Sequence, residues 1–122
     1  VEKKPGMFNY LQSKALLRKI LPSYVQRESQ VLKLLDRMGD NSQTILCCDL
    51  NDIPNSYAYR LLSKNLDDAF LKRGNGFSNT INIVFSIFRI DYVFASKDVH
   101  ILSYKRLKTS LSDHNIVVVE LE

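Results

Sequence analysis

The sequence predicts a mixed α/β fold built as one unit. A stretch of helix formers precedes a short apolar strand-like run, a short helix follows it, and the rest alternates apolar stretches with polar loops. No internal repeat or flexible linker divides the chain. Its 122 residues are enough for a modest core, because a chain of this size buries roughly two thirds of the surface that it exposes when unfolded.

Two helices are predicted before the first strand. Residues 10–21 are rich in helix formers and end before Pro22, which disfavours helix in the residue that precedes it. Ser23 can then cap a longer helix that runs to about Met38 and ends at Gly39. The apolar residues that would turn one face of this helix toward a sheet are Tyr24, Val31, Leu34, Leu35 and Met38.

The middle of the chain predicts a strand followed by a short helix. Residues 44–48 form a continuous apolar run that indicates a buried strand, and it stops at the polar group DLND. Ser56 can cap a short helix that contains Tyr59 and Leu62. Asp67 and Asp68 are expected to cap or turn the chain.

The last part of the chain predicts several strands. Two glycines and two asparagines make residues 73–79 a loop. Apolar stretches predict strands at 81–84, 90–95, 101–107 and 116–121, and residues 109–115 form a polar turn before the last of them.

The composition is that of an ordinary soluble protein, with 45% hydrophobic and 25% charged residues. A net charge of +4 would suit a nucleic acid or a phosphorylated substrate, but the basic residues are spread along the chain, which favours a solvated surface. No apolar run is long enough for a membrane span. Cys47 and Cys48 would point to opposite faces of a strand, so we expect small packed thiols in a reducing compartment such as the cytoplasm.

Two polar pairs could carry chemistry. Asp49 and Asn51 lie just beyond a predicted strand, where they could bind a phosphate or a hydrated Mg²⁺, although both types are also common in turns. Asp113 and His114 precede the last strand, where the aspartate could orient the imidazole, or the pair could simply cap a turn.

A third candidate, Asp91, lies inside the apolar string FRIDYVF. A carboxylate buried in a strand is costly unless it is paired or bound to a metal. Arg89 is two residues away on the same predicted face, so a structural Arg89–Asp91 pair is the alternative to a functional role.

The order and spacing of these three segments resemble the endonuclease/exonuclease/phosphatase superfamily. CDLND resembles its G-D-F-N-D/N motif, FRIDYVF its R-I-D-Y-[IV] strand and LSDHNIV its S-D-H-x-P-[VI] motif, and the resemblance covers about residues 30–121. It implies the C-terminal half of a four-layer α/β/β/α sandwich, with a mixed, largely antiparallel sheet and flanking helices. Residues 1–122 would then be a single partial domain.

The resemblance also implies a Mg²⁺-dependent phosphoester hydrolase, with Mn²⁺ as a possible substitute, whose substrates could include nucleic acid. Asp49 would orient or activate the attacking water, and His114 would stabilise the transition state. Asp91 would position an active-site histidine or shape the phosphate site.

Three further roles follow from the same resemblance. Asn51 would contact the scissile phosphate, Thr80 in the segment SNT would be a second phosphate contact, and Asp113 would bind or position the metal.

The sequence also departs from the superfamily pattern. Cys48 replaces the usual glycine, Leu50 replaces phenylalanine, and Asn115-Ile116 lacks the usual proline. The half that supplies the glutamate acting as principal metal ligand has no counterpart here, and Tyr10 stands where a catalytic histidine would be. We therefore expect this chain to be inactive alone.

Half of a sandwich would leave one apolar sheet face uncovered. We expect that face to bind an N-terminal half of the domain or to drive self-association. The alternative to an enzyme is a degenerate, non-catalytic family member that binds nucleic acid or protein.

Overall fold

The computed structural model describes residues 24–39, 43–81 and 88–122. Several predictions fall outside these residues: the helix at 10–21 with Tyr10, the cap Ser23 of the second helix, and most of the strand at 81–84. Of that last segment, Ile81 is described, and it forms an isolated antiparallel bridge with His114. No helix in the described ranges is long and apolar enough to cross a membrane.

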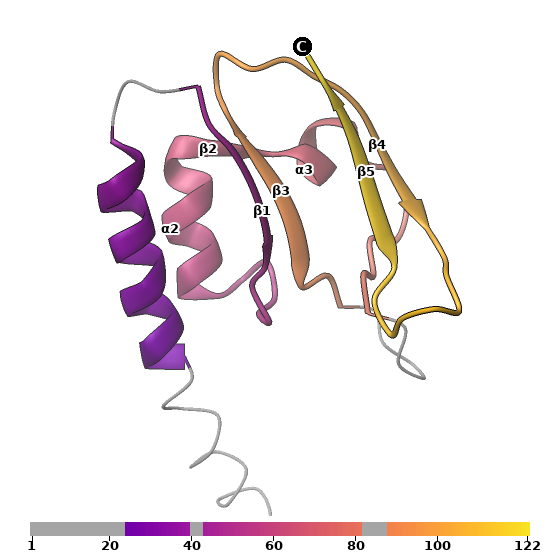
Figure 1. Ribbon diagram of the computed structural model, residues 1–122, viewed down its shortest axis with the longest axis horizontal. Coiled ribbons are helices and arrows are strands. Elements are labelled where there is room, and N and C mark those ends of the chain that lie inside the picture. The colour runs from indigo at the N-terminus through magenta and orange to yellow at the C-terminus, as the bar shows by residue number, and fades with distance from the viewer. Residues whose placement is uncertain (1–23, 40–42, 82–87) are drawn as a thin grey trace, which may run out of the picture.

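The described residues form a mixed α/β structure with antiparallel strand pairing (Figure 1). Residues 24–38 are helical. After them come β1 (Ile45–Asp49), α2 (Tyr57–Asn65), β2 (Leu66–Asp68), α3 (Ala69–Arg73), β3 (Asp91–Ser96), β4 (Ile101–Leu107) and β5 (Ile116–Leu121).

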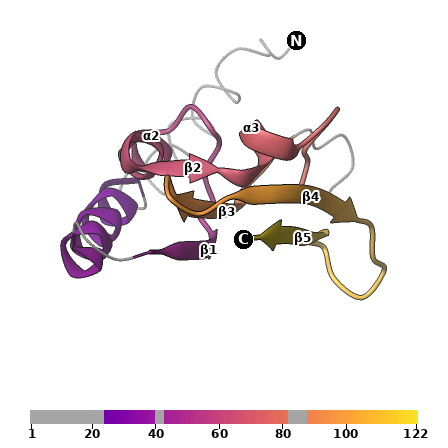
Figure 2. The same ribbon diagram turned by 90° about the horizontal axis from the view of Figure 1, so that it is seen from above.

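β3 is the centre of the main sheet. It lies between β1 and β2 and is antiparallel to both, while β4 and β5 pair with each other as an antiparallel hairpin. In Figure 2 α2 and α3 lie to either side of β2, and the two helices belong to different apolar clusters. This arrangement confirms the predicted mixed α/β class with largely antiparallel pairing and flanking helices.

Helix 24–38 ends as the sequence predicts, because Gly39 takes the left-handed conformation, with φ +65°. Its apolar face meets the sheet through Val31, which is buried, and through Leu34, Leu35 and Met38. Tyr24 does not share this burial and is 44% exposed. It lies in the first turn, and the first turns extend past the end of β1 (Figure 1).

The two faces of β3 contribute to two separate apolar clusters, because successive side chains of a strand point to opposite faces. Tyr92 and Phe94 pack with Tyr59 and Leu62 of α2. The ring centroids of Tyr59 and Tyr92 are 5.3 Å apart. Val93 and Ala95 belong to the second cluster, whose other buried members are Ala69 and Ile101. The central strand is therefore buried on both faces.

β1 is less buried than its apolar sequence predicts. Leu46 and Cys48 pack against the core, but Ile45 is 54% exposed and Cys47 is also exposed. Within the described residues β1 pairs only with β3, so it is an edge strand. The exposure of Ile45 and Cys47 shows that one of its faces is also uncovered. Both cysteines are free, as predicted, and burial raises the pKa of the Cys48 thiol to about 12.

Two elements were not predicted, namely β2 and α3. The side chain of Asp68 accepts a hydrogen bond from the Phe70 amide and so caps α3, which agrees with the expectation that it caps or turns the chain. Ser56 caps α2 as predicted, by accepting from the Tyr59 amide.

Candidate active site

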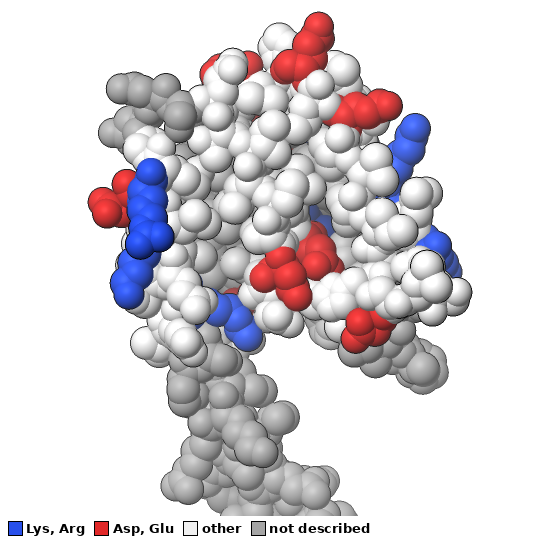
Figure 3. All heavy atoms as spheres, viewed as in Figure 1, with Lys and Arg blue, Asp and Glu red and all other residues white. Residues whose placement is uncertain are grey.

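The site lies where β1 ends and β3 begins. In the antiparallel register Asp49 is paired directly with Asp91, so the two strands bring their carboxylates to the same place. His114, from the turn before β5, joins them, and ligand atoms of the three side chains lie within 4.8 Å of one another. Figure 3 shows acidic side chains gathered over these ends of β1 and β3.

His114 is oriented by Asp91. Its Nδ1 lies 2.9 Å from Asp91 Oδ2, and this hydrogen bond, opposed by slight burial, raises the pKa of the imidazole above its usual value. Because Nδ1 is engaged, Nε2 is the ring nitrogen that can act on a substrate. The suggestion that Asp113 orients the imidazole is wrong, because Nδ1 is bound to Asp91, and the exposed Asp113 carboxylate lies 3.5 Å from the Ser112 hydroxyl.

The predicted Arg89–Asp91 pair is also wrong. Arg89 precedes the start of β3, so the alternation of a strand does not set its direction, and it pairs with Asp68 instead at 2.7 Å. Both side chains are almost fully buried. The guanidinium also lies over the Tyr92 ring, 4.6 Å from its centroid. This buried pair fixes the chain two residues before Asp91. Sequence reasoning missed the role of Asp68 because Asp68 and Arg89 are 21 residues apart in the chain.

Asp49 and Asn51 form a tight turn. The Asn51 amide donates to Asp49 Oδ1 at 2.8 Å, and Asn51 Nδ2 lies 3.3 Å from Oδ2. Asn51 has φ +47°, a left-handed conformation that asparagine tolerates better than most residues. The turn interpretation of this pair is therefore realised, and both side chains remain exposed to a ligand.

The position of Thr80 does not suit a contact with a substrate phosphate. Its side chain is fully buried, and its Oγ1 accepts hydrogen bonds from the amides of Ile90 and Asp91, both at 3.0 Å. The assignment of Thr80 as a phosphate ligand is therefore corrected, because its oxygen is committed to the backbone of β3.

An open hollow lies beside these residues. Its walls are Cys47, Cys48, Asp49, Asp91, Tyr92, Val93, Asn115 and Val117. Two carboxylates and an imidazole there offer oxygen and nitrogen ligands to a cation, and a general base or acid to a bound substrate. Asp113 is exposed and does not belong to this group of potential metal ligands.

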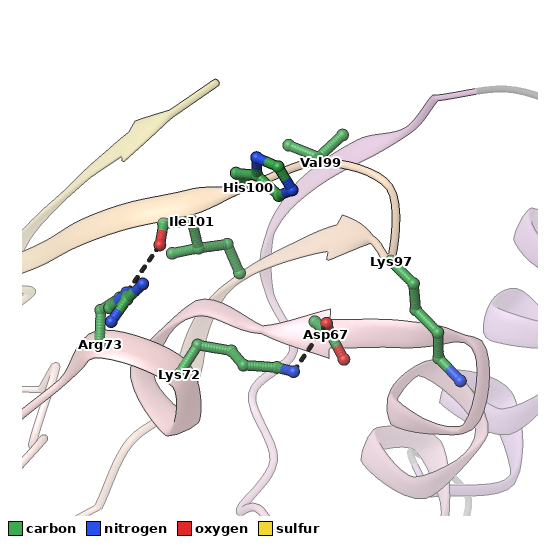
Figure 4. A pocket seen from close by; sticks show the side chains of 7 residues that line it. All are labelled: Asp67, Lys72, Arg73, Lys97, Val99, His100 and Ile101. Carbon is green, nitrogen blue, oxygen red and sulfur yellow. Dashed lines mark hydrogen bonds and ion pairs between the residues drawn. The ribbon is translucent and has the colours of Figure 1, made fainter.

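A second hollow, the distal basic hollow, lies at the other end of β3. It is lined by Asp67, Lys72, Arg73, Lys97, Val99, His100 and Ile101. Its cationic groups do not point to one centre (Figure 4): Lys72 extends to Asp67, at 3.0 Å, and Arg73 Nε donates to the Ile101 carbonyl, at 2.8 Å. Lys97 points away from both.

Comparison with known proteins agrees with this geometry. The model of the endonuclease/exonuclease/phosphatase family matches residues 18–114. A mannosyl-6-phosphatase from Bacteroides thetaiotaomicron is 26% identical with a TM-score of 0.65, and the match covers 79% of this chain and 45% of that one.

A second protein from the same organism, described as an endonuclease/exonuclease/phosphatase family protein, is 27% identical with a TM-score of 0.69; the match covers 80% of this chain and 44% of that one. The chain thus spans less than half the length of either structure. A search of curated proteins gave no significant match. The family match and the shared fold together show that this chain belongs to the endonuclease/exonuclease/phosphatase family.

Proposed function

We propose that this chain carries the Asp91–His114 part of the active site of a Mg²⁺-dependent phosphoester hydrolase. The observation that supports it best is the hydrogen bond between His114 Nδ1 and Asp91 Oδ2, 2.9 Å long, beside the carboxylate of Asp49. A mannosyl-6-phosphatase among the similar structures agrees with a phosphoester substrate.

The donor atoms fit a hard divalent cation in part. Mg²⁺ prefers oxygen and is usually held by one or two carboxylates together with water and substrate phosphate. Asp49 is exposed, and we propose that it and Asp113 are the residues of this chain that would hold Mg²⁺ or Mn²⁺. When bound, the cation would neutralise charge on the phosphoryl oxygens. A glutamate from outside this sequence would complete the ligands.

The side chains of this chain would orient the histidine, the attacking water and the phosphoryl group. Asp91 holds His114 in the Nδ1–H form, so that Nε2 faces the substrate and the imidazolium, when formed, is stabilised by the carboxylate. Asp49 orients the attacking water, and Asn51 contacts a phosphoryl oxygen. The raised pKa of His114 favours the charged imidazole, which suits a group that stabilises developing negative charge.

Hydrolysis tests this proposal. We expect the full-length protein to hydrolyse a generic phosphodiester or phosphomonoester only with Mg²⁺ or Mn²⁺, and His114→Ala and Asp113→Ala to abolish that activity. The chain alone should be inactive under the same conditions. Metal-independent hydrolysis, or activity that survives His114→Ala, would contradict the assigned roles.

Metal binding can be measured without activity. Paramagnetic Mn²⁺ should broaden the NMR signals of Asp49 and Asp113 and of their neighbours Asp91 and His114, and a chelator should restore them. Asp49→Asn should weaken the broadening, because it removes an ionised ligand. Equal broadening at Lys72 in the distal basic hollow would show nonspecific binding instead.

We also propose that the open strand faces bind an N-terminal half of a family domain. Ile45 of β1 is 54% exposed, and Ile116 and Val118 of β5 are 49% and 40% exposed, so both strands present apolar side chains to solvent. Sedimentation of the chain alone should show self-association that Ile116→Lys reduces. A compact monomer that does not bind hydrophobic dyes would contradict this proposal.

A second candidate function is non-catalytic binding of nucleic acid or protein. The exposed apolar strand residues and the net charge of +4 favour it. Salt-sensitive DNA binding without Mg²⁺-dependent hydrolysis would support this alternative. Hydrolysis restored by adding an N-terminal half would rule it out.

A further inference from the structure

Thr80 is a buried junction between the two segments that carry Asp91 and His114. On one side, its Oγ1 accepts from the amides of Ile90 and Asp91, each at 3.0 Å. The same residue is fully buried, so water does not compete for these bonds. The hydroxyl therefore fixes the backbone position from which the Asp91 side chain extends.

On the other side, the backbone of Thr80 holds the segment that carries His114. The carbonyl of Thr80 accepts from the Asn115 amide at 2.6 Å. The next residue, Ile81, bridges His114 itself. One residue thus touches the chain at Asp91 and at the immediate neighbour of His114.

The residue before Thr80 is anchored as well. The Asn79 side-chain oxygen accepts from Arg106 Nη1 at 2.8 Å, and its carbonyl accepts from Asn115 Nδ2 at 3.1 Å. Arg106 belongs to β4, so the Asn79–Thr80 segment is tied to the hairpin as well as to β3. These contacts give Thr80 a fixed frame from which to hold Asp91.

We propose that Thr80 is a positioning residue that sets the Asp91 carboxylate at hydrogen-bond distance from His114 Nδ1, rather than a residue that contacts the substrate. The hydroxyl is required because only an acceptor can serve the two amides, and removing it would leave both buried without a partner. This inference rests on the proposed function only in assuming that the Asp91–His114 pair acts on the phosphoester.

The tautomer of His114 reports this role without substrate or metal. While Asp91 accepts from Nδ1–H, the neutral imidazole carries its proton on Nδ1, and ¹⁵N chemical shifts distinguish that form from the Nε2–H form. His100, the other of the two histidines in the chain, is exposed and serves as the internal reference. All spectra would be recorded with a chelator present.

Thr80→Val keeps the shape of the side chain and removes the acceptor. We expect it to lose the Nδ1–H signature of His114 and to speed hydrogen exchange of the Ile90 and Asp91 amides roughly tenfold, as expected for a lost hydrogen bond. Thr80→Ser, which keeps the hydroxyl, should restore both. Thr109→Val is the matched control, because the Thr109 hydroxyl accepts from one backbone amide, that of Leu111, away from the pair.

The result that overturns the proposal is a Thr80→Val protein that keeps the Nδ1–H signature while its amides exchange faster, since Thr80 would then support the backbone alone. Loss of the signature in Thr109→Val would overturn it too. If Thr80→Val does not fold, Thr80→Cys, whose thiol is a weaker acceptor, decides by the same two measurements. Because no step uses hydrolysis, a full-length protein that lacks phosphoesterase activity but shows the expected tautomer would refute the proposed function and leave this inference standing.

Discussion

The two ends of β3 both collect charged side chains, but only one end brings them together. At its start, Asp91 is paired with Asp49 across the strands and contacts His114 at 2.9 Å. At its end, in the distal basic hollow, Lys72 and Arg73 each contact a separate partner. The difference lies in what holds the chain: buried polar contacts fix the first end, whereas exposed side chains make up much of the second.

The buried pair between Arg89 and Asp68 makes this contrast measurable. Their nitrogen and oxygen atoms are 2.7 Å apart, and Asp68 also accepts from the Tyr59 hydroxyl at 2.7 Å. Asp68→Asn would leave a buried guanidinium without its counter-charge, which typically costs about 3–5 kcal/mol. We expect a loss of that size in the free energy of unfolding, measured by urea denaturation.

The matched control for this change is Asp67→Asn, one residue away. Its partner Lys72 is 53% exposed, so the pair is solvent-screened and contributes about 1 kcal/mol or less. Equal losses in the two variants would show that burial does not distinguish the two ends of β3.

The Asp91–His114 contact gives the next largest expected effect. Asp91→Asn removes the carboxylate that raises the pKa of His114, so that pKa should fall toward the ordinary value of 6.5. NMR titration in the presence of a chelator measures the pKa of His114 in the wild type and in the variant. An unchanged His114 pKa would mean that the hydrogen bond is not formed in solution.

The same contact gives a pH dependence of stability with a definite sign. Because folding raises the pKa of His114, the folded state binds the proton more tightly than the unfolded chain. The stabilisation is fully present below pH 6.5 and is lost as the pH rises through the folded pKa. Urea denaturation at several pH values should show this loss in the wild type, and Asp91→Asn should abolish it.

The strands were the most predictable part of the fold. Apolar runs at 101–107 and 116–121 have the bounds of β4 and β5, and the run at 44–48 differs from β1 by one residue at each end. β2 and α3 were missed because three and five residues are too short to show a period. β2 exists through its pairing with β3, which a local pattern cannot reveal.

The candidate site was predictable in its residue types and less so in its contacts. Motif resemblance selected Asp49, Asp91 and His114, and the structure brings them together. Adjacency in the sequence favours Asp113 as the partner of His114, whereas the residue that binds its imidazole, Asp91, is 23 residues away. The resemblance implies a phosphate contact for Thr80, because nothing in the sequence shows that its hydroxyl is buried against β3.

The smallest expected effect belongs to the distal basic hollow. Lys72→Met removes a charge that lies 3.0 Å from Asp67 while keeping most of the apolar stem, so packing is little changed. We expect the free energy of unfolding to fall by about 1 kcal/mol or less, and the difference to shrink further in high salt, which screens exposed charges. A salt-independent loss of unfolding free energy as large as that of Asp68→Asn would contradict this. The Lys72–Asp67 pair would then be held as firmly as the buried pair, and charges would fix both ends of β3.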